Sequence, residues 1–311
     1  MTRRILAPAA LVLLVLALTA CGSEDATSVG PSPTATDTTE TSGGSDGGEP
    51  TGTETTPTET APAEPVSFQV WFAAPDLDER LNGGGDPKLF PVRRSAQTVA
   101  VGRAALEELI AGPAAGDGER VSSALPAGTR LLGLNIEDGL ATVDLSAEFE
   151  SGGGSLSMQM RLAQVVFTLT QFPTVDRVEF RLDGEPVDVF SGEGIVLDGP
   201  VDRGDYEDLM PAILVDRPAP GARISSPVTV SGSANVFEAN VTVRILDASG
   251  DEIESTFTTA TCGTGCRGDF SVAVTFPAQP SGSEGFVVVE DDDAAGMGFP
   301  PHQVRIPVVF G

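Results

Sequence analysis

Residues 22–65 consist mainly of Thr, Ser, Gly, Pro and acidic side chains, with no basic residue and almost no large apolar one. A segment of this composition cannot bury enough apolar surface to offset the loss of chain entropy on folding. We therefore expect residues 21–65 to form a disordered tether, roughly 35 Å long as a random coil and about 135 Å when nearly extended. Folded domains are expected only between residues 66 and 311.

The first 20 residues have the layout of a signal peptide. Arg3 and Arg4 form a short basic start, and an almost unbroken apolar run covers residues 5–18. This run is shorter than the roughly 20 apolar residues of a comfortable membrane-spanning helix. Residues 18–21, Leu-Thr-Ala-Cys, resemble the lipobox of bacterial lipoproteins, whose cysteine is lipidated. The resemblance implies an extracytoplasmic protein anchored to the cell membrane by lipid on Cys21, and ordinary secretion is the alternative.

The chain of 311 residues is long enough for two domains and has a formal net charge of −27. A surface this acidic repels the phosphate backbone of nucleic acids and anionic lipid head groups. We therefore expect no nucleic-acid partner. The same charge is compatible with a merely soluble protein.

Cys262 and Cys266 enclose a Gly-Thr-Gly segment. Paired cysteines outside the cytoplasm favour a disulfide, and the glycines let the backbone bring them together. Half of a zinc site is the alternative, but zinc needs about four ligands and the only histidine, His302, lies far away in the sequence. A disulfide across so short a loop contributes about 2 kcal/mol in the chain-entropy model and fixes a hairpin.

Residues 66–190 show helical and strand periodicity in alternation. This pattern predicts an α+β domain, a mixed sheet with two helices on one of its faces. Asp138-Gly139 between two apolar runs predicts a type I′ hairpin turn. The expected elements are strands at 67–72 and 89–92, a helix from Ser95 to about Ala111, a hairpin over 130–145, a helix from Ser155 to about Phe172 and a strand at 175–182.

Residues 191–211 form a connector, and helical periodicity is absent from 212–311. About seven short Val- and Thr-rich runs occur there, separated by turn residues. This number of strands in roughly 100 residues is typical of an all-β immunoglobulin-like sandwich.

Several segments in order resemble the GerMN (sporulation and spore germination) domain and then the immunoglobulin-like domain of bacterial spore germination. The first set is residues 89–93, 109–113, 125–129, 141–146, 164–169 and 180–184, and the second is 218–221, 226–232 and 235–240. The resemblance implies an envelope lipoprotein with a role in envelope, sporulation or germination assemblies. It also implies that the domains work by binding other proteins.

Few side chains suggest catalysis. His302 has no nucleophile motif beside it, and we expect it to be solvated or structural. Asp144, Ser146 and Glu148 end a hairpin strand, where paired carboxylates could serve a hydrolase but more often form a solvated edge. Asp291–Asp293 could bind Ca²⁺ through oxygen ligands, but without the spacing of an EF-hand an exposed acidic loop is the favoured interpretation.

The sequence therefore predicts a non-enzymatic lipoprotein that binds a protein or cell-wall partner, with no catalytic residue, no metal site and no cofactor. The alternative is a cell-wall polysaccharide hydrolase or a carbohydrate-binding accessory. Carbohydrate sites usually need exposed aromatic rings, and the chain has only one Trp and one Tyr. The oligomeric state is not predicted.

Overall fold

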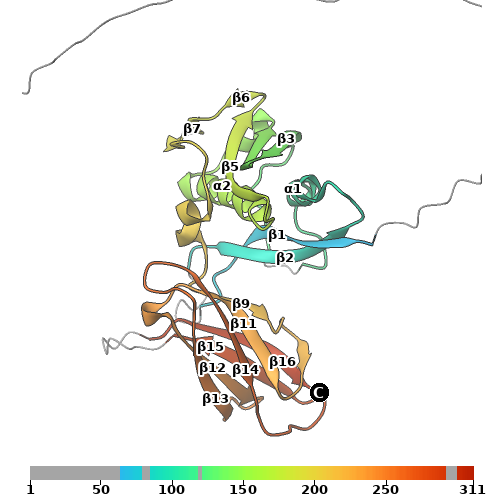
Figure 1. The fold of residues 1–311 in the computed structure, drawn as a ribbon, viewed down its shortest axis with the longest axis vertical. Coiled ribbons are helices and arrows are strands. Elements are labelled where there is room, and N and C mark those ends of the chain that lie inside the picture. Colours follow the sequence, from blue (N-terminus) through green and yellow to red (C-terminus); the bar gives the residue numbers. More distant parts are fainter. Residues whose placement is uncertain (1–63, 79–84, 118–120, 292–299) are drawn as a thin grey trace, which may run out of the picture. The chain divides into compact units, whose positions relative to one another are not determined.

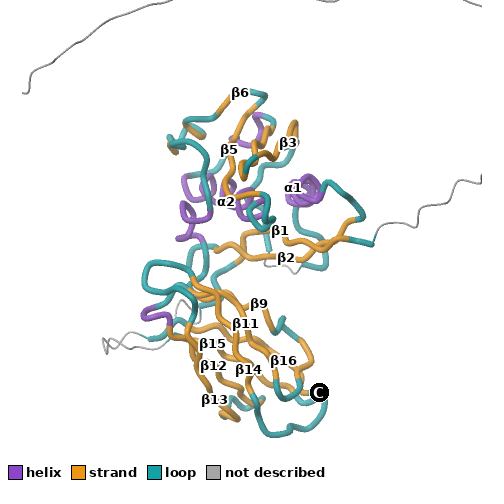
Figure 2. The backbone as a smooth tube through the Cα atoms, viewed as in Figure 1, coloured by secondary structure: helices purple, strands orange, loops and turns teal. Residues whose placement is uncertain are grey.

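The computed structural model describes residues 64–78, 85–117, 121–291 and 300–311 (Figures 1 and 2). The predicted signal peptide, the lipobox with Cys21 and almost all of the predicted tether lie outside the described residues. The described part has an α+β first domain and an all-β, immunoglobulin-like second domain, as the sequence predicts. Within these residues, no helix has both the length and the apolar character needed to cross a membrane.

The first domain contains two main sheets and a separate two-stranded sheet. Its elements are β1 (Val66–Ala74), β2 (Lys88–Ala96), α1 (Val101–Ala111), β3 (Leu131–Glu137), β4 (Gly139–Leu145), η2 (Ala147–Glu150), α2 (Ser155–Leu169), β5 (Val175–Leu182), β6 (Glu185–Pro186), β7 (Val189–Phe190), β8 (Ile195–Val196) and η3 (Arg203–Leu209). β1 and β2 form an antiparallel pair, and β3, β4, β5 and β6 form a mixed sheet in that order. β7 and β8 form the separate two-stranded sheet. The parallel pairing of β4 with β5 requires a crossover, which α2 supplies.

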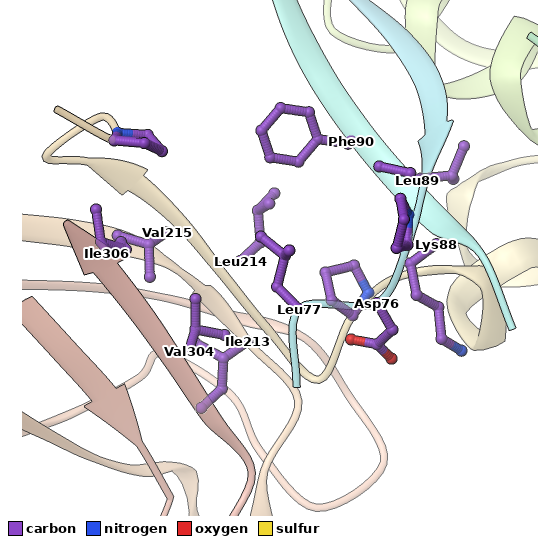
Figure 3. Close-up of a pocket in the computed structure, with 14 residues that line it drawn as sticks. Asp76, Leu77, Lys88, Leu89, Phe90, Ile213, Leu214, Val215, Val304 and Ile306 are labelled. Carbon is purple, nitrogen blue, oxygen red and sulfur yellow. The ribbon is translucent and has the colours of Figure 1, made fainter. Parts of the chain in front are cut away.

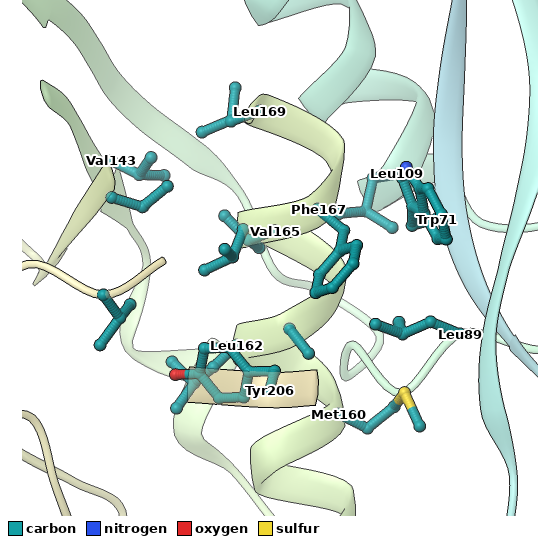
Figure 4. Close-up of a cluster of buried hydrophobic side chains, with 14 of the residues drawn as sticks. Trp71, Leu89, Leu109, Val143, Met160, Leu162, Val165, Phe167, Leu169 and Tyr206 are labelled. Atoms are coloured by element: carbon teal, nitrogen blue, oxygen red, sulfur yellow. The ribbon is translucent and has the colours of Figure 1, made fainter. Parts of the chain in front are cut away.

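Helix α2 is buried on all sides from Met160 onward, because this part lies between β1–β2 and the mixed sheet. Figure 4 shows Trp71 and Leu89 on one side of this helix and Val143 on the other. Every residue from Met160 to Leu169 is buried. The expected mixed sheet is therefore present, but β1 and β2 do not join it. They cover the side of α2 that a single-sheet arrangement would leave exposed.

Two expected boundaries are wrong. Residues 89–92 belong to a longer strand, because β2 pairs with β1 over nine residues, from Lys88 to Ala96. That pairing also takes up Ser95, so α1 begins at Val101 rather than near Ser95. The hairpin turn is as predicted, with φ of 49° at Asp138 and 80° at Gly139. Positive φ at both central residues is the geometry of a type I′ turn.

In the second domain, two sheets whose strands are mostly antiparallel pack around one hydrophobic core. Its elements are β9 (Ile213–Arg217), β10 (Ala222–Ile224), β11 (Val228–Ala234), η4 (Phe237–Ala239), β12 (Asn240–Asp247), β13 (Glu252–Thr259), β14 (Gly268–Val274), β15 (Glu284–Glu290) and β16 (Gln303–Phe310). The order is β10-β16-β15-β12-β13 in one sheet and β14-β11-β9 in the other. Alternate residues of the strands, among them Val230, Val243 and Val287, fill the space between the sheets.

Candidate interaction groove

An open groove with a volume of about 490 Å³ lies beside the start of α1. Val99 and Val101 line it from the loop and the first turn of the helix, Leu134 and Ile136 from β3, and Phe172 from the segment after α2. Val99 is 99% exposed and Ile136 is 38% exposed. The groove is therefore an accessible surface made mainly of aliphatic side chains.

The groove depends on a close approach of α1 to β3. A Cβ atom added at Gly102 would meet the Ile136 Cδ1 atom at 3.4 Å and the Leu134 Cδ2 atom at 3.7 Å. These are ordinary van der Waals separations, so the start of the helix lies beside the strand with room for a small side chain at this position. The apolar side chains of β3 lie beside the helix without being covered by it.

Strand β3 is an edge of the mixed sheet and pairs only with β4. An irregularity in the pairing between Leu131 and Gly133 leaves Leu132 45% exposed. Such bulges limit uncontrolled pairing of edge strands. The exposed apolar surface therefore extends from the groove along this edge.

The charged side chains near the groove are of both signs. Arg103 of α1 lies 3.6 Å from Glu107, and both are well exposed. Glu137 and Asp138 follow Ile136 directly and are exposed. The charged residue that lines the groove itself is Arg103, so a partner would meet mainly aliphatic side chains there.

A second, smaller pocket is also apolar (Figure 3). Its lining includes Leu89 and Phe90 of β2, Leu214 of β9, and Val304 and Ile306 of β16. Its volume is about 50 Å³. This is far below the roughly 300 Å³ at which pockets for small ligands begin, so it is a packing gap.

The structure joins Cys262 and Cys266 by a disulfide, with their Cα atoms 5.7 Å apart. Both residues are half-buried. The oxidation state of this pair in the cell stays a prediction, and so does lipidation of Cys21, which lies outside the described residues.

Ser146 and Glu148 lie together beside Arg130, whereas Asp144 contacts a different turn. Ser146 is fully buried, and its Oγ accepts a hydrogen bond from the Arg130 backbone N–H at 3.0 Å. Asp144 accepts a hydrogen bond from the Gly184 backbone N–H at 2.9 Å. Hydrogen bonding to Ser146, and more weakly the charge of Arg130, hold the pKa of Glu148 below its ordinary value. A carboxyl group with a lowered pKa is poorly suited to act as a general acid near neutral pH.

His302 contacts acidic residues. Its Nδ1 atom lies 2.7 Å from Asp78 Oδ2, and its backbone N–H donates to Asp291 Oδ1 at 2.6 Å. Asp292 and Asp293, which complete the acidic run considered for Ca²⁺, lie outside the described residues. Among the residues that the structure does describe, no three His, Cys, Asp or Glu side chains are grouped so that they could hold a metal ion.

The only Trp and the only Tyr of the chain are both in the core. Trp71 is 3% exposed and Tyr206 is 6% exposed. Trp71 packs against Phe167, with ring centroids 5.1 Å apart. Neither ring is exposed for stacking on a sugar.

Arg161 is a buried residue that the sequence analysis missed. It is 4% exposed and donates to the backbone carbonyls of Ala124, Phe149 and Gly152 at 2.7–2.9 Å. Burial lowers its pKa. The local signal was an arginine between the apolar residues Met160 and Leu162, but this pattern did not identify its backbone partners.

Two families match the chain in succession. Residues 69–188 match the family described as sporulation and spore germination, and residues 212–297 match the immunoglobulin-like domain of bacterial spore germination. A comparison with curated proteins gave no match.

Solved structures show similarity to parts of the chain. A candidate lipoprotein from Clostridium perfringens is 23% identical, with a TM-score of 0.32, over 47% of this chain and 93% of that one. The first GerMN domain of the sporulation protein GerM from Bacillus subtilis is 24% identical, with a TM-score of 0.34, over 43% of this chain and 98% of that one. The tandem GerMN domains of GerM are 17% identical, with a TM-score of 0.37, over 68% and 61% of the respective chains.

The two family matches agree with the α+β and immunoglobulin-like folds in the same order along the chain. Residues 69–188 therefore belong to the sporulation and spore germination (GerMN) family, and residues 212–297 belong to the family of immunoglobulin-like domains of bacterial spore germination.

Proposed function

We propose that this protein is an extracytoplasmic lipoprotein, anchored through lipid on Cys21, that binds a protein partner in a sporulation or germination assembly. It acts by binding and not by catalysis. The descriptions of both matched families support the biological setting. The lipobox at residues 18–21 supports the anchor, and a tether raises the local concentration of the domains near a membrane-associated partner.

The groove beside α1 is the observation that carries the proposal. Its exposed side chains are aliphatic, and Val99 is almost completely exposed. Aliphatic surface is suited to apolar side chains of another protein, whereas a sugar would need aromatic rings or a dense set of polar groups.

The residues considered for catalysis support a structural role instead. Ser146 is buried as a hydrogen-bond acceptor, and Asp144 binds the backbone of a neighbouring turn. His302 is paired with Asp78. Each of these three side chains therefore has a structural contact that requires no reaction.

Photo-crosslinking in intact cells tests the groove. A photoreactive residue in place of Val99 is expected to capture a specific protein, whereas the same residue in place of Val189 is not. Val189 is a matched control because it is also an exposed valine, at 54%, but lies on β7 away from the groove. Capture of glycan strands instead of protein at Val99 would support the cell-wall alternative.

Complementation of a deletion strain tests the mode of action. Val99→Asp is expected to abolish complementation, while Val189→Asp complements. His302→Ala and the pair Asp144→Asn with Glu148→Gln are expected to complement, with circular dichroism as the control for folding. Loss of function in either of these folded variants, to the level of the deletion, would favour an enzyme.

A further inference from the structure

Arg267 directly follows Cys266 and binds the connector. Its Nε atom lies 2.9 Å from Glu207 Oε1, and its Nη2 donates to the Pro211 carbonyl at 2.6 Å. Its Nη1 donates to the Ser233 hydroxyl at 3.3 Å. Glu207 lies in η3. Tyr206 and Leu209 of the same segment are buried in the hydrophobic core of the first domain. One guanidinium group therefore holds two successive parts of the connector.

Asn235 forms a second link to the same carboxylate. Its Nδ2 donates to Glu207 Oε1 at 3.3 Å, and its Oδ1 accepts from the Gly265 backbone N–H at 3.0 Å. Gly265 lies inside the loop that Cys262 and Cys266 close. Both side chains that bind Glu207 are thus positioned by the disulfide loop, one by chain continuity and one by a hydrogen bond.

The loop between Cys262 and Cys266 contains two successive residues with positive φ. Thr264 has φ of 55° and Gly265 has φ of 96°. A threonine with positive φ is unfavourable and persists only where its surroundings fix it. The Thr264 N–H donates to the Val236 carbonyl at 2.9 Å, and its hydroxyl accepts from the Glu238 N–H at 2.8 Å. The covalent bond between the loop ends adds to these contacts.

We propose that the Cys262–Cys266 disulfide keeps Arg267 and Asn235 bound to Glu207, and that its reduction loosens the connector from the immunoglobulin-like domain. A dithiol is the reductant. The sulfur–sulfur bond breaks, Cys262 and Cys266 each gain a proton to become thiols, and the dithiol is oxidised to its own disulfide. Both cysteine residues are partly exposed to solvent.

Hydrogen exchange of the purified full-length protein tests this coupling. Reduction with dithiothreitol, verified by alkylation of both thiols, is expected to accelerate amide exchange in residues 203–211 about fivefold. Exchange in β12 and β15 of the same domain is expected to stay unchanged. The pair Cys262→Ser with Cys266→Ser should match the reduced protein without any reductant.

Glu207→Ala is the variant that isolates the link. Its residues 203–211 should already exchange fast in the oxidised protein, and reduction should add nothing further. The proposal is overturned if verified reduction leaves residues 203–211 unaffected, or if it accelerates them equally in Glu207→Ala. Faster exchange throughout the second domain would show that the disulfide stabilises that domain alone, and this result would also overturn the proposal. Two free thiols in the native protein would overturn it as well.

Discussion

Polar side chains in and after α2 bind the edge of β1 that does not pair with β2. The Thr168 hydroxyl accepts from the Trp71 N–H at 3.1 Å, and Gln164 Nε2 donates to the Trp71 carbonyl at 3.0 Å. Gln171 accepts from the Gln69 N–H and donates to its carbonyl, both at 2.6 Å. Residues 164, 168 and 171 are spaced three or four apart and therefore lie on one face of the helix. Residues 69 and 71 are spaced two apart, so both present their backbone groups to that face.

Gln164→Leu is expected to destabilise the first domain by about 1–3 kcal/mol, because it leaves the Trp71 carbonyl and the Ala124 N–H unpaired in a buried place. Urea denaturation followed by Trp71 fluorescence measures this, since Trp71 is the only Trp of the chain and lies in the first core. Gln159→Leu, on an exposed position of the same helix, should be nearly neutral. Equal effects of the two substitutions would contradict the role of Gln164.

The pair formed by Arg94 and Asp117 makes the first domain sensitive to acid. Hydrogen bonding to Arg94 lowers the pKa of Asp117 below its ordinary value of 3.8, and the N–H of Ala114 adds a second bond at 2.6 Å. A carboxylate with a lowered folded-state pKa stabilises the domain above its unfolded pKa and loses that contribution as the pH falls through the folded value.

Asp117→Asn is therefore expected to lower stability at pH 7 by about 1 kcal/mol or more. It should also weaken the dependence of stability on pH below about pH 4. Denaturation midpoints from Trp71 fluorescence between pH 7 and pH 3 measure both effects. Glu107→Gln is the control, since that carboxylate is 59% exposed. A pH dependence unchanged by Asp117→Asn would refute the assignment.

The hydrogen-bond partners of the buried polar residues could not be predicted from the sequence. Arg161, Gln164 and Thr168 occupy helix positions that resemble ordinary polar interruptions of an apolar stripe. Their partners are backbone atoms of β1 and of loops up to 97 positions away in the sequence. No local pattern encodes such a partner, because the pairing exists only after α2 is enclosed by two sheets.

Among the elements, the β3–β4 hairpin follows directly from local chemistry. Asp138-Gly139 was sufficient to predict its turn, because few residue pairs accept positive φ at both positions. Gly139 has φ of 80°, and a Cβ atom there would clash with the Asp176 side chain. The boundaries of β2 and α1 were not predictable in this way, because the pairing of Ser95 with Ser67 decides them and that pairing is not local.

Gly139→Val is expected to destabilise the first domain by about 1 kcal/mol or more, through backbone strain and the clash with Asp176. Gly116→Val is the matched control. Gly116 has no atom within 4 Å of an added Cβ and no positive φ. Thermal unfolding monitored by Trp71 fluorescence compares the two, and an unchanged melting temperature for Gly139→Val would contradict the strain argument.

In the molecule as a whole, the order of the two domains could be predicted because helical periodicity ends where short strands begin. The immunoglobulin-like sandwich follows from the number and spacing of those strands. The separate β1–β2 sheet did not follow from the sequence. An α+β pattern leaves open whether a hairpin joins the main sheet or covers the opposite side of a helix. In the structure the β1–β2 hairpin covers α2, and every residue of the helix from Met160 to Leu169 is buried.

Membrane attachment is the property of the whole chain that one residue is expected to control. If lipid on Cys21 is the anchor, the full-length protein partitions into a detergent phase, because acyl chains contribute about 0.8 kcal/mol for each buried CH₂ group. Cys21→Ala should move the protein to the aqueous phase, since the variant has no thiol at this position to carry lipid. The pair Cys262→Ser with Cys266→Ser is the control and should remain in the detergent phase. A Cys21→Ala variant that stays with the detergent would show that the attachment depends on something other than this cysteine.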